Sequence, residues 1–283
     1  MVFSTLVTTE ELTKHLGDPA WRVFDCRFSL SDTAAGEEAY RHSHIPAAHY
    51  VHLERDLSSP VTADSGRHPL PARETLIIKL GEWGVAHDSQ VVVYDDANGA
   101  FAARLWWLLR WLGHERVAVL DGGWAKWLRE GHSTTAGISF RRRVVFQDGP
   151  SLSKWVTVGE VQDGLALQTI QLIDARSPGR FRGELEPIDS IAGHVPGAVN
   201  RPFQNNLGED GRFLPAHQLR DQIMRQLGRF WPEQAVHMCG SGVTACHNLL
   251  AMEIAGLKGS RIYAGSWSEW IRDPSRPVAK AQA

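Results

Sequence analysis

Cys239 stands at the start of a short glycine-containing segment that is suited to thiol chemistry. An apolar strand is predicted to end at Cys239, a helix is predicted over residues 245–255, and C-G-S-G-V-T joins them. Gly240 and Gly242 allow successive backbone N–H groups to turn inward, and the helix N-terminus adds partial positive charge there. Because this setting stabilises an anionic sulfur, the sequence predicts that Cys239 is a nucleophile; a buried structural cysteine is the alternative.

Three other readings of this segment can be compared with the residues present. A cysteine phosphatase needs Cys-x5-Arg, but Ala245 is the sixth residue after Cys239. A thioredoxin-like oxidoreductase needs Cys-x-x-Cys, and Gly242 takes the second position. A non-catalytic sulfur-carrier or binding protein would be marked by loss of the cysteine, which this chain retains. The residues present therefore favour a nucleophilic cysteine that belongs to none of these three classes.

The composition limits the partners and the compartment. Lys and Arg number 30 against 32 Asp and Glu, so the net charge of -2 supplies no basic footprint for nucleic acid or an anionic membrane. The most apolar run, at 105–112, is too short to cross a bilayer, and the N-terminus shows no targeting pattern. The 3 cysteines are widely spaced, which indicates free thiols in a reducing compartment; we expect the cytoplasm. Cys26 and Cys246 are expected to be small core residues.

The chain contains an internal repeat. V-T-T-E-E-L at 7–12 matches V-T-V-G-E-V at 156–161, and both carry the Thr-x-x-Glu spacing of a helix capping box. Four further pairs follow in the same order: R-V-F-D-C-R with Q-L-I-D-A-R, H-I-P-A-A with H-V-P-G-A, Q-V-V-V-Y-D-D with Q-A-V-H-M-C-G, and L-D-G-G-W with Y-A-G-S-W. We therefore predict two homologous domains, at 1–135 and 157–283, with a linker over 136–156.

Each repeat alternates short apolar strands with amphipathic helices. Strands are predicted at 91–93, 117–119 and 172–173, and helices at 72–83 and 216–227. This alternation predicts an α/β fold, in which each domain has a mostly parallel sheet with helices on both faces. Functional loops then follow the carboxyl ends of the strands, which is where Cys239 is placed.

The first repeat provides an internal comparison for the cysteine. Asp95 aligns with Cys239, and an aspartate cannot act as a sulfur nucleophile. We expect Asp95 to serve as a loop or helix-cap residue. The N-terminal domain is therefore predicted to be non-catalytic, and the chemistry is assigned to the C-terminal domain.

Taken together, the D-x-R, H-[IV]-P-[GA]-A, strand-Cys and G-S-W motifs resemble those of the two-domain rhodanese-type sulfurtransferases. The resemblance covers nearly the whole chain, and G-R-F-R-G at 179–183 and T-A-C-H at 244–247 add to it. The loop C-G-S-G-V-T resembles the 3-mercaptopyruvate sulfurtransferase branch, whereas thiosulfate-preferring rhodaneses typically carry C-R-K-G-V-T.

The resemblance implies a ping-pong reaction through a Cys239 persulfide. A sulfane sulfur would pass from 3-mercaptopyruvate or thiosulfate to Cys239, and then to a thiol or cyanide. Ser241 would hydrogen-bond the charge that develops on the leaving fragment, although a hydroxyl that only tightens the loop is the alternative. Thr244 would cap the helix. Substrate contacts are expected from Gly240, Gly242, Val243 and Thr244.

Further site residues follow only from the resemblance. Arg180 matches an arginine that binds the donor anion, and Glu54 and His68 match residues beside the active cysteine. At Ile188 the chain departs from the expected Glu-Pro-Arg pattern, which removes one substrate arginine. Because the loop itself carries no cation, we expect 3-mercaptopyruvate to be preferred over thiosulfate; a thiosulfate:cyanide sulfurtransferase is the alternative.

The expected partners are small. They comprise a small-molecule sulfur donor and an acceptor that is cyanide or a thiol such as thioredoxin or glutathione. No nucleic acid, membrane or cofactor is expected, and the chain is expected to be a monomer. His44 and His194 recur as a pair, but no ligand spacing accompanies them, so a structural loop role is predicted rather than metal binding.

Overall fold

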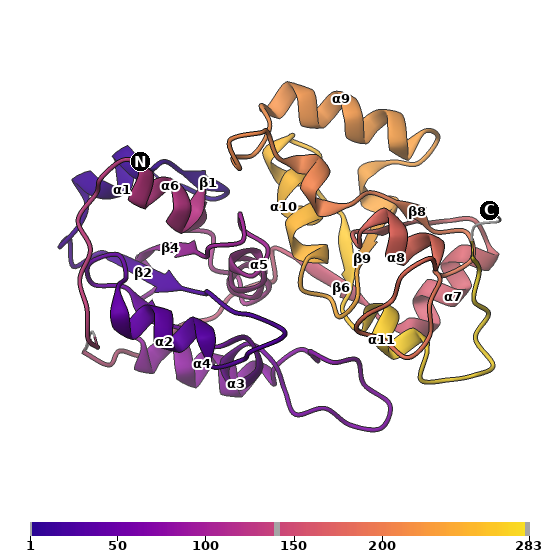
Figure 1. The fold of residues 1–283 in the computed structure, drawn as a ribbon, viewed down its shortest axis with the longest axis horizontal. Coiled ribbons are helices and arrows are strands. Elements are labelled where there is room, and N and C mark those ends of the chain that lie inside the picture. Colours follow the sequence, from indigo (N-terminus) through magenta and orange to yellow (C-terminus); the bar gives the residue numbers. More distant parts are fainter. Residues whose placement is uncertain (1, 139–141, 281–283) are drawn as a thin grey trace. The chain divides into compact units, whose positions relative to one another are not determined.

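The computed structural model describes residues 2–138 and 142–280. Its chain contacts divide it into two compact units (Figure 1). Unit 1 comprises Met1–Ser59, Leu70–Leu152 and Asp210–Arg212, and unit 2 comprises Pro60–Pro69, Ser153–Glu209 and Phe213–Ala283. Residues 60–69 thus belong with the C-terminal half of the chain. The predicted linker includes residues 139–141, which lie outside the described residues, and its last residues form strand β6. The domain boundaries at 135 and 157 stay a prediction.

Unit 1 contains a five-stranded sheet and its helices. The strands are β1 (Leu6–Val7), β2 (Trp21–Asp25), β3 (His49–Tyr50), β4 (Gln90–Tyr94) and β5 (Val117–Leu120). The helices are α1 (Thr9–Lys14), α2 (Ala35–His42), α3 (Leu53–Asp56), α4 (Arg73–Glu82), α5 (Ala102–Trp111) and α6 (Gly123–Arg129).

Unit 2 repeats this plan. The strands are β6 (Lys154–Val156), β7 (Gln171–Asp174), β8 (Val199–Asn200), β9 (Ala235–Met238) and β10 (Arg261–Tyr263). The helices are α7 (Val158–Ala166), α8 (Pro178–Arg182), α9 (Ala216–Leu227), α10 (Ala245–Ile254) and α11 (Ser266–Trp270), with short 3₁₀ turns η1 (Phe203–Asn206) and η2 (Pro232–Gln234).

The two sheets have the same topology. The strand orders are β1-β5-β4-β2-β3 and β6-β10-β9-β7-β8, and the strand pairs within both sheets are parallel. Each strand of unit 1 therefore has a counterpart at the same place in unit 2. The α/β prediction of two domains, each with a parallel sheet, is confirmed.

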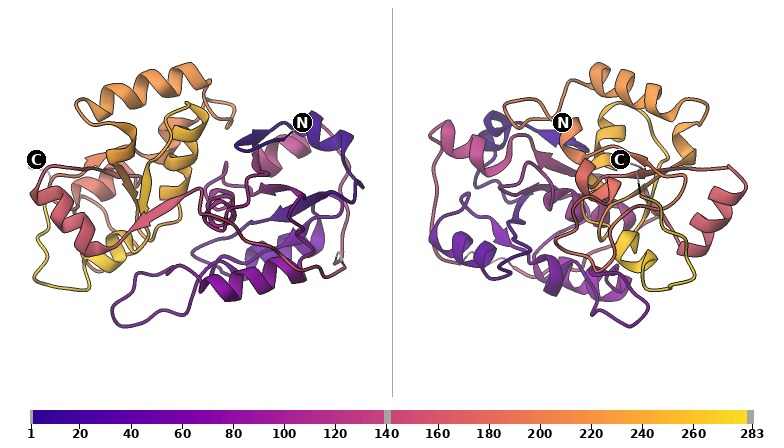
Figure 2. Two further views of the ribbon diagram at one scale, coloured as in Figure 1. Left: turned by 180° about the vertical axis from the view of Figure 1, so that it is seen from behind. Right: turned by 45° about the vertical axis from the view of Figure 1, so that its right-hand side comes forward.

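Helices cover both faces of the sheet in unit 2 (Figures 1 and 2). Leu172 of β7 packs into a core with Val161 of α7 and Trp267 of α11. Its neighbour Ile173 packs on the opposite face with Leu219 of α9. Because successive strand side chains point to opposite faces, burial on both sides requires the continuous apolar runs seen in the sequence.

The repeated D-x-R and G-x-W motifs meet in each unit. In unit 2, Arg176 forms a buried ion pair with Asp174, with Nη2 to Oδ2 at 2.7 Å, and stacks over Trp267 at 4.6 Å from the ring centroid. Unit 1 repeats the arrangement with Arg27, Asp25 at 2.6 Å and Trp124 at 4.6 Å. The arginine connects the end of one strand to the helix after another, which explains why both motifs recur together.

The two Thr-x-x-Glu sequences behave differently. At Thr157 the capping box is complete, since the threonine accepts from the Glu160 N–H and Glu160 accepts from the Thr157 N–H. At Thr8 only the first bond forms, because the Glu11 carboxylate pairs with Lys14 at 3.1 Å. The prediction of two equivalent capping boxes is therefore wrong at Thr8, where a basic residue one turn later takes the carboxylate.

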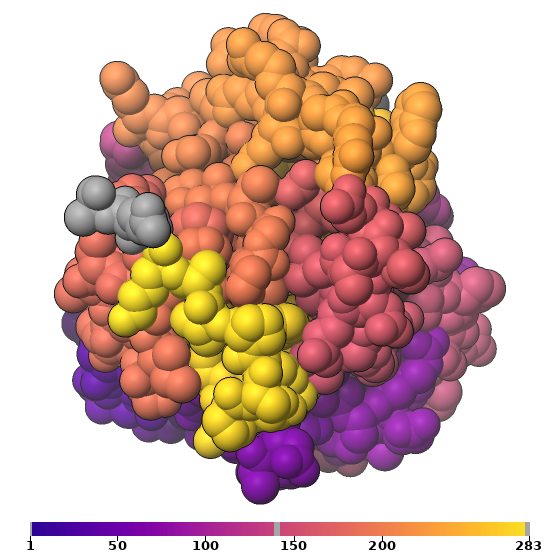
Figure 3. All heavy atoms as spheres, turned by 90° about the vertical axis from the view of Figure 1, so that its right-hand side faces the viewer, coloured from indigo at the N-terminus to yellow at the C-terminus, as the bar shows by residue number. Residues whose placement is uncertain are grey.

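The histidine of each H-[IV]-P motif holds a surface segment. His194 exchanges backbone hydrogen bonds with Ala279 in the C-terminal segment, which lies on the face of unit 2 seen in Figure 3. His44 makes the same exchange with Thr135. The ring nitrogen Nδ1 of each histidine contacts a backbone carbonyl oxygen, at 2.8 Å and 2.6 Å respectively. These contacts support the structural role predicted for the pair.

Candidate active site

Cys239 lies at the carboxyl end of β9, directly before the loop that leads into α10. Its carbonyl oxygen accepts from the N–H of Trp267 at 3.0 Å, and its own N–H donates to the Ser266 Oγ at 3.1 Å. The start of α11 thus fixes the cysteine backbone on both sides. Only 3% of the residue is exposed.

Two backbone donors hold the Cys239 sulfur. The N–H groups of Ser241 and Gly242 point to it, at 3.4 Å and 3.1 Å. Gly242 has φ of +79°, and a Cβ there would lie 2.2 Å from the Ala264 carbonyl oxygen, so the loop requires glycine at this position. The N–H pair forms the inward-facing nest expected from the loop sequence.

The corresponding loop of unit 1 is filled by its own side chain. The carboxylate of Asp95 accepts four backbone N–H bonds, each at 2.8 Å, from Ala97, Gly99, Phe101 and Ala102. Its backbone carbonyl accepts from Trp124 as that of Cys239 does from Trp267. Asp95 therefore caps the N-terminus of α5. Burial raises the pKa of this carboxyl, and the four N–H bonds act against that effect.

Ser241 is paired with a histidine that is distant in sequence. Its Oγ lies 2.7 Å from the Nδ1 of His68, and both residues are buried. His68 belongs to the 60–69 segment of unit 2. The structure thus brings two of the predicted site residues together and gives the Ser241 hydroxyl a partner for proton exchange.

Two guanidinium groups lie against Gly240. A Cβ placed on this glycine would be 2.8 Å from the Nη2 of Arg67 and 3.5 Å from both terminal nitrogens of Arg180. Arg180 is a predicted site residue, but Arg67 was missed; the adjacent His68 was the only signal that could have indicated it. Burial lowers the pKa of Arg67, and charge on the Cys239 sulfur opposes this effect.

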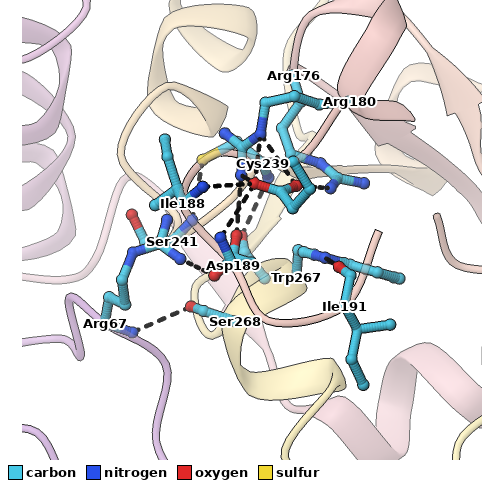
Figure 4. A network of polar contacts seen from close by, with 12 residues as sticks. Arg67, Arg176, Arg180, Ile188, Asp189, Ile191, Cys239, Ser241, Trp267 and Ser268 are labelled. Atoms are coloured by element: carbon cyan, nitrogen blue, oxygen red, sulfur yellow. Dashed lines mark hydrogen bonds and ion pairs between the residues drawn. The ribbon is translucent and has the colours of Figure 1, made fainter. Parts of the chain in front are cut away.

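Both arginines are already paired with carboxylates (Figure 4). Asp189 bridges them: Oδ1 contacts the Nη1 of Arg67, and Oδ2 accepts from the Nη2 of Arg180 at 2.8 Å. Glu186 accepts from the Nε of Arg180 at 2.9 Å and pairs with Arg176 at 3.3 Å. The cations near the loop therefore come from outside it, and each has an acidic partner.

A cavity of about 360 Å³ adjoins this network. Its lining residues are Arg67, Ile188, Asp189, Ser190, Ser268, Ile271 and Arg272. Ile188, at the position where an arginine was expected, is 42% exposed. The cavity is thus lined by the apolar side chain of Ile188 and by the cations of Arg67 and Arg272.

The remaining loop residues differ in what they do. Val243 is buried, and its carbonyl accepts from the Cys246 N–H at 3.1 Å. Thr244 stands at the N-cap of α10, but its side chain makes no capping hydrogen bond, so that prediction is wrong. Thr244 has helical backbone angles, with φ of -72° and ψ of -11°, whereas a capping side chain needs an extended residue.

Glu54 lies on α3 in unit 1, where its N–H donates to the Nδ1 of His52 at 3.2 Å. Its role in the site stays a prediction. Within residues 2–138 and 142–280, no three His, Cys, Asp or Glu side chains are grouped so that they could hold a metal ion. No helix in this part of the chain is both long and apolar enough to span a bilayer.

Comparison with known protein families finds the same duplicated domain that the fold shows. The rhodanese-like domain matches the chain twice, at residues 8–130 and 157–273. The chain belongs to the rhodanese-like domain family as a tandem pair of domains.

Its relatives define the enzyme class. A probable 3-mercaptopyruvate sulfurtransferase of Pseudomonas aeruginosa is 50% identical over 99% of both chains. A putative thiosulfate sulfurtransferase of Mycobacterium tuberculosis is 38% identical over 98% of both chains. The solved SseA of Escherichia coli, described as a 3-mercaptopyruvate sulfotransferase, is 31% identical, with a TM-score of 0.80 over 94% of this chain and 100% of the other. This chain is accordingly a sulfurtransferase.

Proposed function

We propose that this chain moves a sulfane sulfur from 3-mercaptopyruvate, through a Cys239 persulfide, to a thiol acceptor or to cyanide. The main observation behind this proposal is that the N–H groups of Ser241 and Gly242 point to the Cys239 sulfur, while the Ser241 hydroxyl is paired with His68. The relative from Pseudomonas aeruginosa, named for this donor, supports the assignment.

In the first half-reaction, the Cys239 thiolate attacks the donor sulfur. A sulfur–sulfur bond forms, the carbon–sulfur bond of the donor breaks, and its electron pair passes into the enolate of pyruvate. The Ser241 hydroxyl donates to the developing enolate oxygen, and His68, 2.7 Å away, supports the proton movement. The thiol proton of the donor is released from the new persulfide, and the enolate takes up a proton to give pyruvate.

In the second half-reaction, an acceptor thiolate or cyanide attacks the outer sulfur of the persulfide. The new bond forms as the persulfide bond breaks, and the electron pair returns to Cys239 as a thiolate. Because both resting forms are anionic at sulfur, the same two N–H donors serve both.

The donor carboxylate is assigned to the guanidinium groups beside Gly240. Arg180 and Arg67 both lie next to the loop that holds the reacting sulfur. The buried Nε of Arg67 has no hydrogen-bond partner among the described residues, so this side chain retains a free donor. A planar guanidinium suits an anion with two oxygens.

Thiosulfate is a second candidate donor. The observation that favours it is the same pair of arginines. They place cations beside the loop, whereas thiosulfate-preferring rhodaneses typically carry basic residues in the loop itself. Relatives named thiosulfate sulfurtransferase, such as that of Rattus norvegicus at 34% identity, also support it.

The cellular compartment, the oligomeric state and the role of the first domain are also part of the proposal. We infer a cytoplasmic, monomeric protein in which the first domain supports the second without sulfur chemistry of its own. The free cysteines and the carboxylate-filled loop at Asp95 support this view.

Mass spectrometry of the intact protein tests the function. After incubation with 3-mercaptopyruvate, the wild type should gain the mass of one sulfur atom, and a thiol acceptor should remove it. Cys239→Ser is the control and should gain nothing. A wild type that gains no sulfur from either donor would contradict the proposed function.

A further inference from the structure

The cations beside the catalytic loop belong to an ionic cluster with no net formal charge. Three arginines and three carboxylates pair within unit 2: Arg67, Arg176, Arg180, Asp174, Glu186 and Asp189. The side chains of Glu186 and Asp189 are 3% and 4% exposed. Solvent therefore screens these pairs only weakly. An anion that enters beside Gly240 meets arginines that are already neutralised.

Asp189 differs from the other two acids in what it contacts. Asp174 pairs with the buried Arg176, and Glu186 pairs with Arg176 and with Arg180. Asp189 instead bridges Arg67 and Arg180, the two arginines that lie against Gly240, and it also lines the adjoining cavity. Its carboxylate occupies the position between two guanidinium groups that the anionic end of a donor would use.

We propose that Asp189 is a specificity-determining residue that acts as an internal counter-anion and favours a donor with one negative charge over a donor with two. This inference rests on the proposed function. 3-Mercaptopyruvate carries one carboxylate, whereas thiosulfate is a dianion at neutral pH. Each added donor charge is repelled by Asp189 and by the Cys239 thiolate, so the dianion meets the larger penalty.

This assignment explains how the loop can discriminate although two arginines lie beside it. Arg67 and Arg180 each share their charge with a buried acid, so these two arginines attract an incoming donor less than two unpaired cations would. Removal of the Asp189 charge would leave the arginines with an excess of positive charge. Thiosulfate should gain more from that change than 3-mercaptopyruvate.

Alkylation of Cys239 tests the charge without any sulfur transfer. Iodoacetate carries one negative charge, and iodoacetamide, of nearly the same size, carries none. The rate ratio of iodoacetate to iodoacetamide should rise about tenfold in Asp189→Asn. Asp189→Glu restores the charge and should keep a ratio near the wild-type value.

Glu184→Gln is the matched control, because Glu184 is an acid in the same segment that is 58% exposed and pairs with Arg182 at 2.6 Å. Its ratio should not change. If Asp189 only holds the arginines in place, Asp189→Asn would leave the ratio unchanged or lower it, and the proposal would be overturned.

The wild type offers a measurement that does not depend on how the variant folds. If the arginines are neutralised, its iodoacetate to iodoacetamide ratio should be close to that of a free thiol such as glutathione. A ratio far above that of the free thiol would show that the arginines act as free cations, and it would contradict the role assigned to Asp189.

Steady-state kinetics completes the test. Asp189→Asn should raise kcat/KM for thiosulfate, relative to 3-mercaptopyruvate, by about tenfold. A relative value that stays the same or falls would overturn the proposal. Failure of the wild type to use either donor would instead refute the proposed function, while the alkylation ratios would still decide the role of Asp189.

Discussion

At the scale of single residues, the three cysteines differ in what surrounds the sulfur. Cys239 receives two backbone N–H bonds. Cys26 lies beside Asp25 in the core of unit 1, where burial, with nearby carboxylates, raises the pKa of its thiol well above the usual value. Cys246 donates to the Gly242 carbonyl at 3.4 Å from inside α10. The two donors at Cys239 are placed to stabilise an anionic sulfur.

The first prediction is that Cys239→Ser loses sulfur transfer and keeps its fold, because a serine hydroxyl cannot carry a persulfide. Cys26→Ser and Cys246→Ser should keep most of the activity of the folded protein. Donor-dependent pyruvate release, with circular dichroism as the check on folding, measures this. Wild-type turnover by Cys239→Ser would exclude the proposed nucleophile.

At the scale of elements, the strand–loop–helix unit sets the geometry of the sulfur. Gly240 and Gly242 have different roles within it. A side chain at Gly242 would meet the backbone of Ala264, whereas a side chain at Gly240 would meet the flexible ends of Arg67 and Arg180. The two glycines therefore form a matched pair for substitution.

The second prediction compares these glycines. Gly242→Ala should lower kcat/KM by about 100-fold or more, because the loop must shift and its N–H groups leave the sulfur. Gly240→Ala should mainly raise the KM for 3-mercaptopyruvate, by about tenfold, because it displaces the arginines. Steady-state kinetics separates the two effects; equal losses of kcat would contradict the division of roles.

Strand β9 carries a buried histidine that gives a stability prediction. His237 lies two residues before Cys239, and its Nε2 donates to the Met252 Sδ at 3.0 Å. Burial lowers its pKa to about 3. Below the unfolded pKa of about 6.5, the unfolded chain binds a proton that the folded chain refuses, so stability falls as the pH falls.

The third prediction follows from this loss of stability at low pH. Between pH 7.5 and 5, His237 should cost the wild type about 2 kcal/mol of unfolding free energy. His237→Leu, which keeps the volume and removes the titrating group, should show a fall that is smaller by that amount. Urea unfolding at both pH values measures it. Parallel pH profiles for the two proteins would refute this account.

At the scale of the whole molecule, one scaffold occurs twice with different anions in the corresponding loop. Unit 1 fills its loop with the Asp95 carboxylate, and unit 2 presents the Cys239 sulfur. The duplicated sheet order gives both loops the same place at the carboxyl end of the sheet. The charged groups beside the Cys239 loop come from the 60–69 segment and from the segment after α8, and we propose that they set the choice of donor.

The fourth prediction concerns donor preference. The wild type should show a higher kcat/KM for 3-mercaptopyruvate than for thiosulfate. Ile188→Arg should lower the KM for 3-mercaptopyruvate about tenfold, because it adds a cation to the cavity beside Arg67 and Asp189. Kinetics with both donors measures this. A clear wild-type preference for thiosulfate would contradict the donor assignment.

The sequence by itself determined the features that are local or repeated. The duplication, the parallel α/β plan and the helices predicted at 216–227 and 245–255, observed at 216–227 and 245–254, follow from patterns along the chain. The nest around Cys239 follows in the same way from two glycines between a strand and a helix. The missing side-chain cap at Thr244 marks the limit of such patterns, because its backbone angles depend on the loop as a whole.

Only the tertiary structure decided which side-chain atoms of distant residues contact one another in the site. His68 reaches Ser241 across 173 positions, and Arg67 reaches Asp189 across 122, because the 60–69 segment packs with the second half of the chain. The physical reason is that ion pairing and hydrogen bonding act through space, so their partners leave no periodic trace in the sequence. The bridge that one carboxylate, Asp189, makes between Arg67 and Arg180 could be found only in the folded structure.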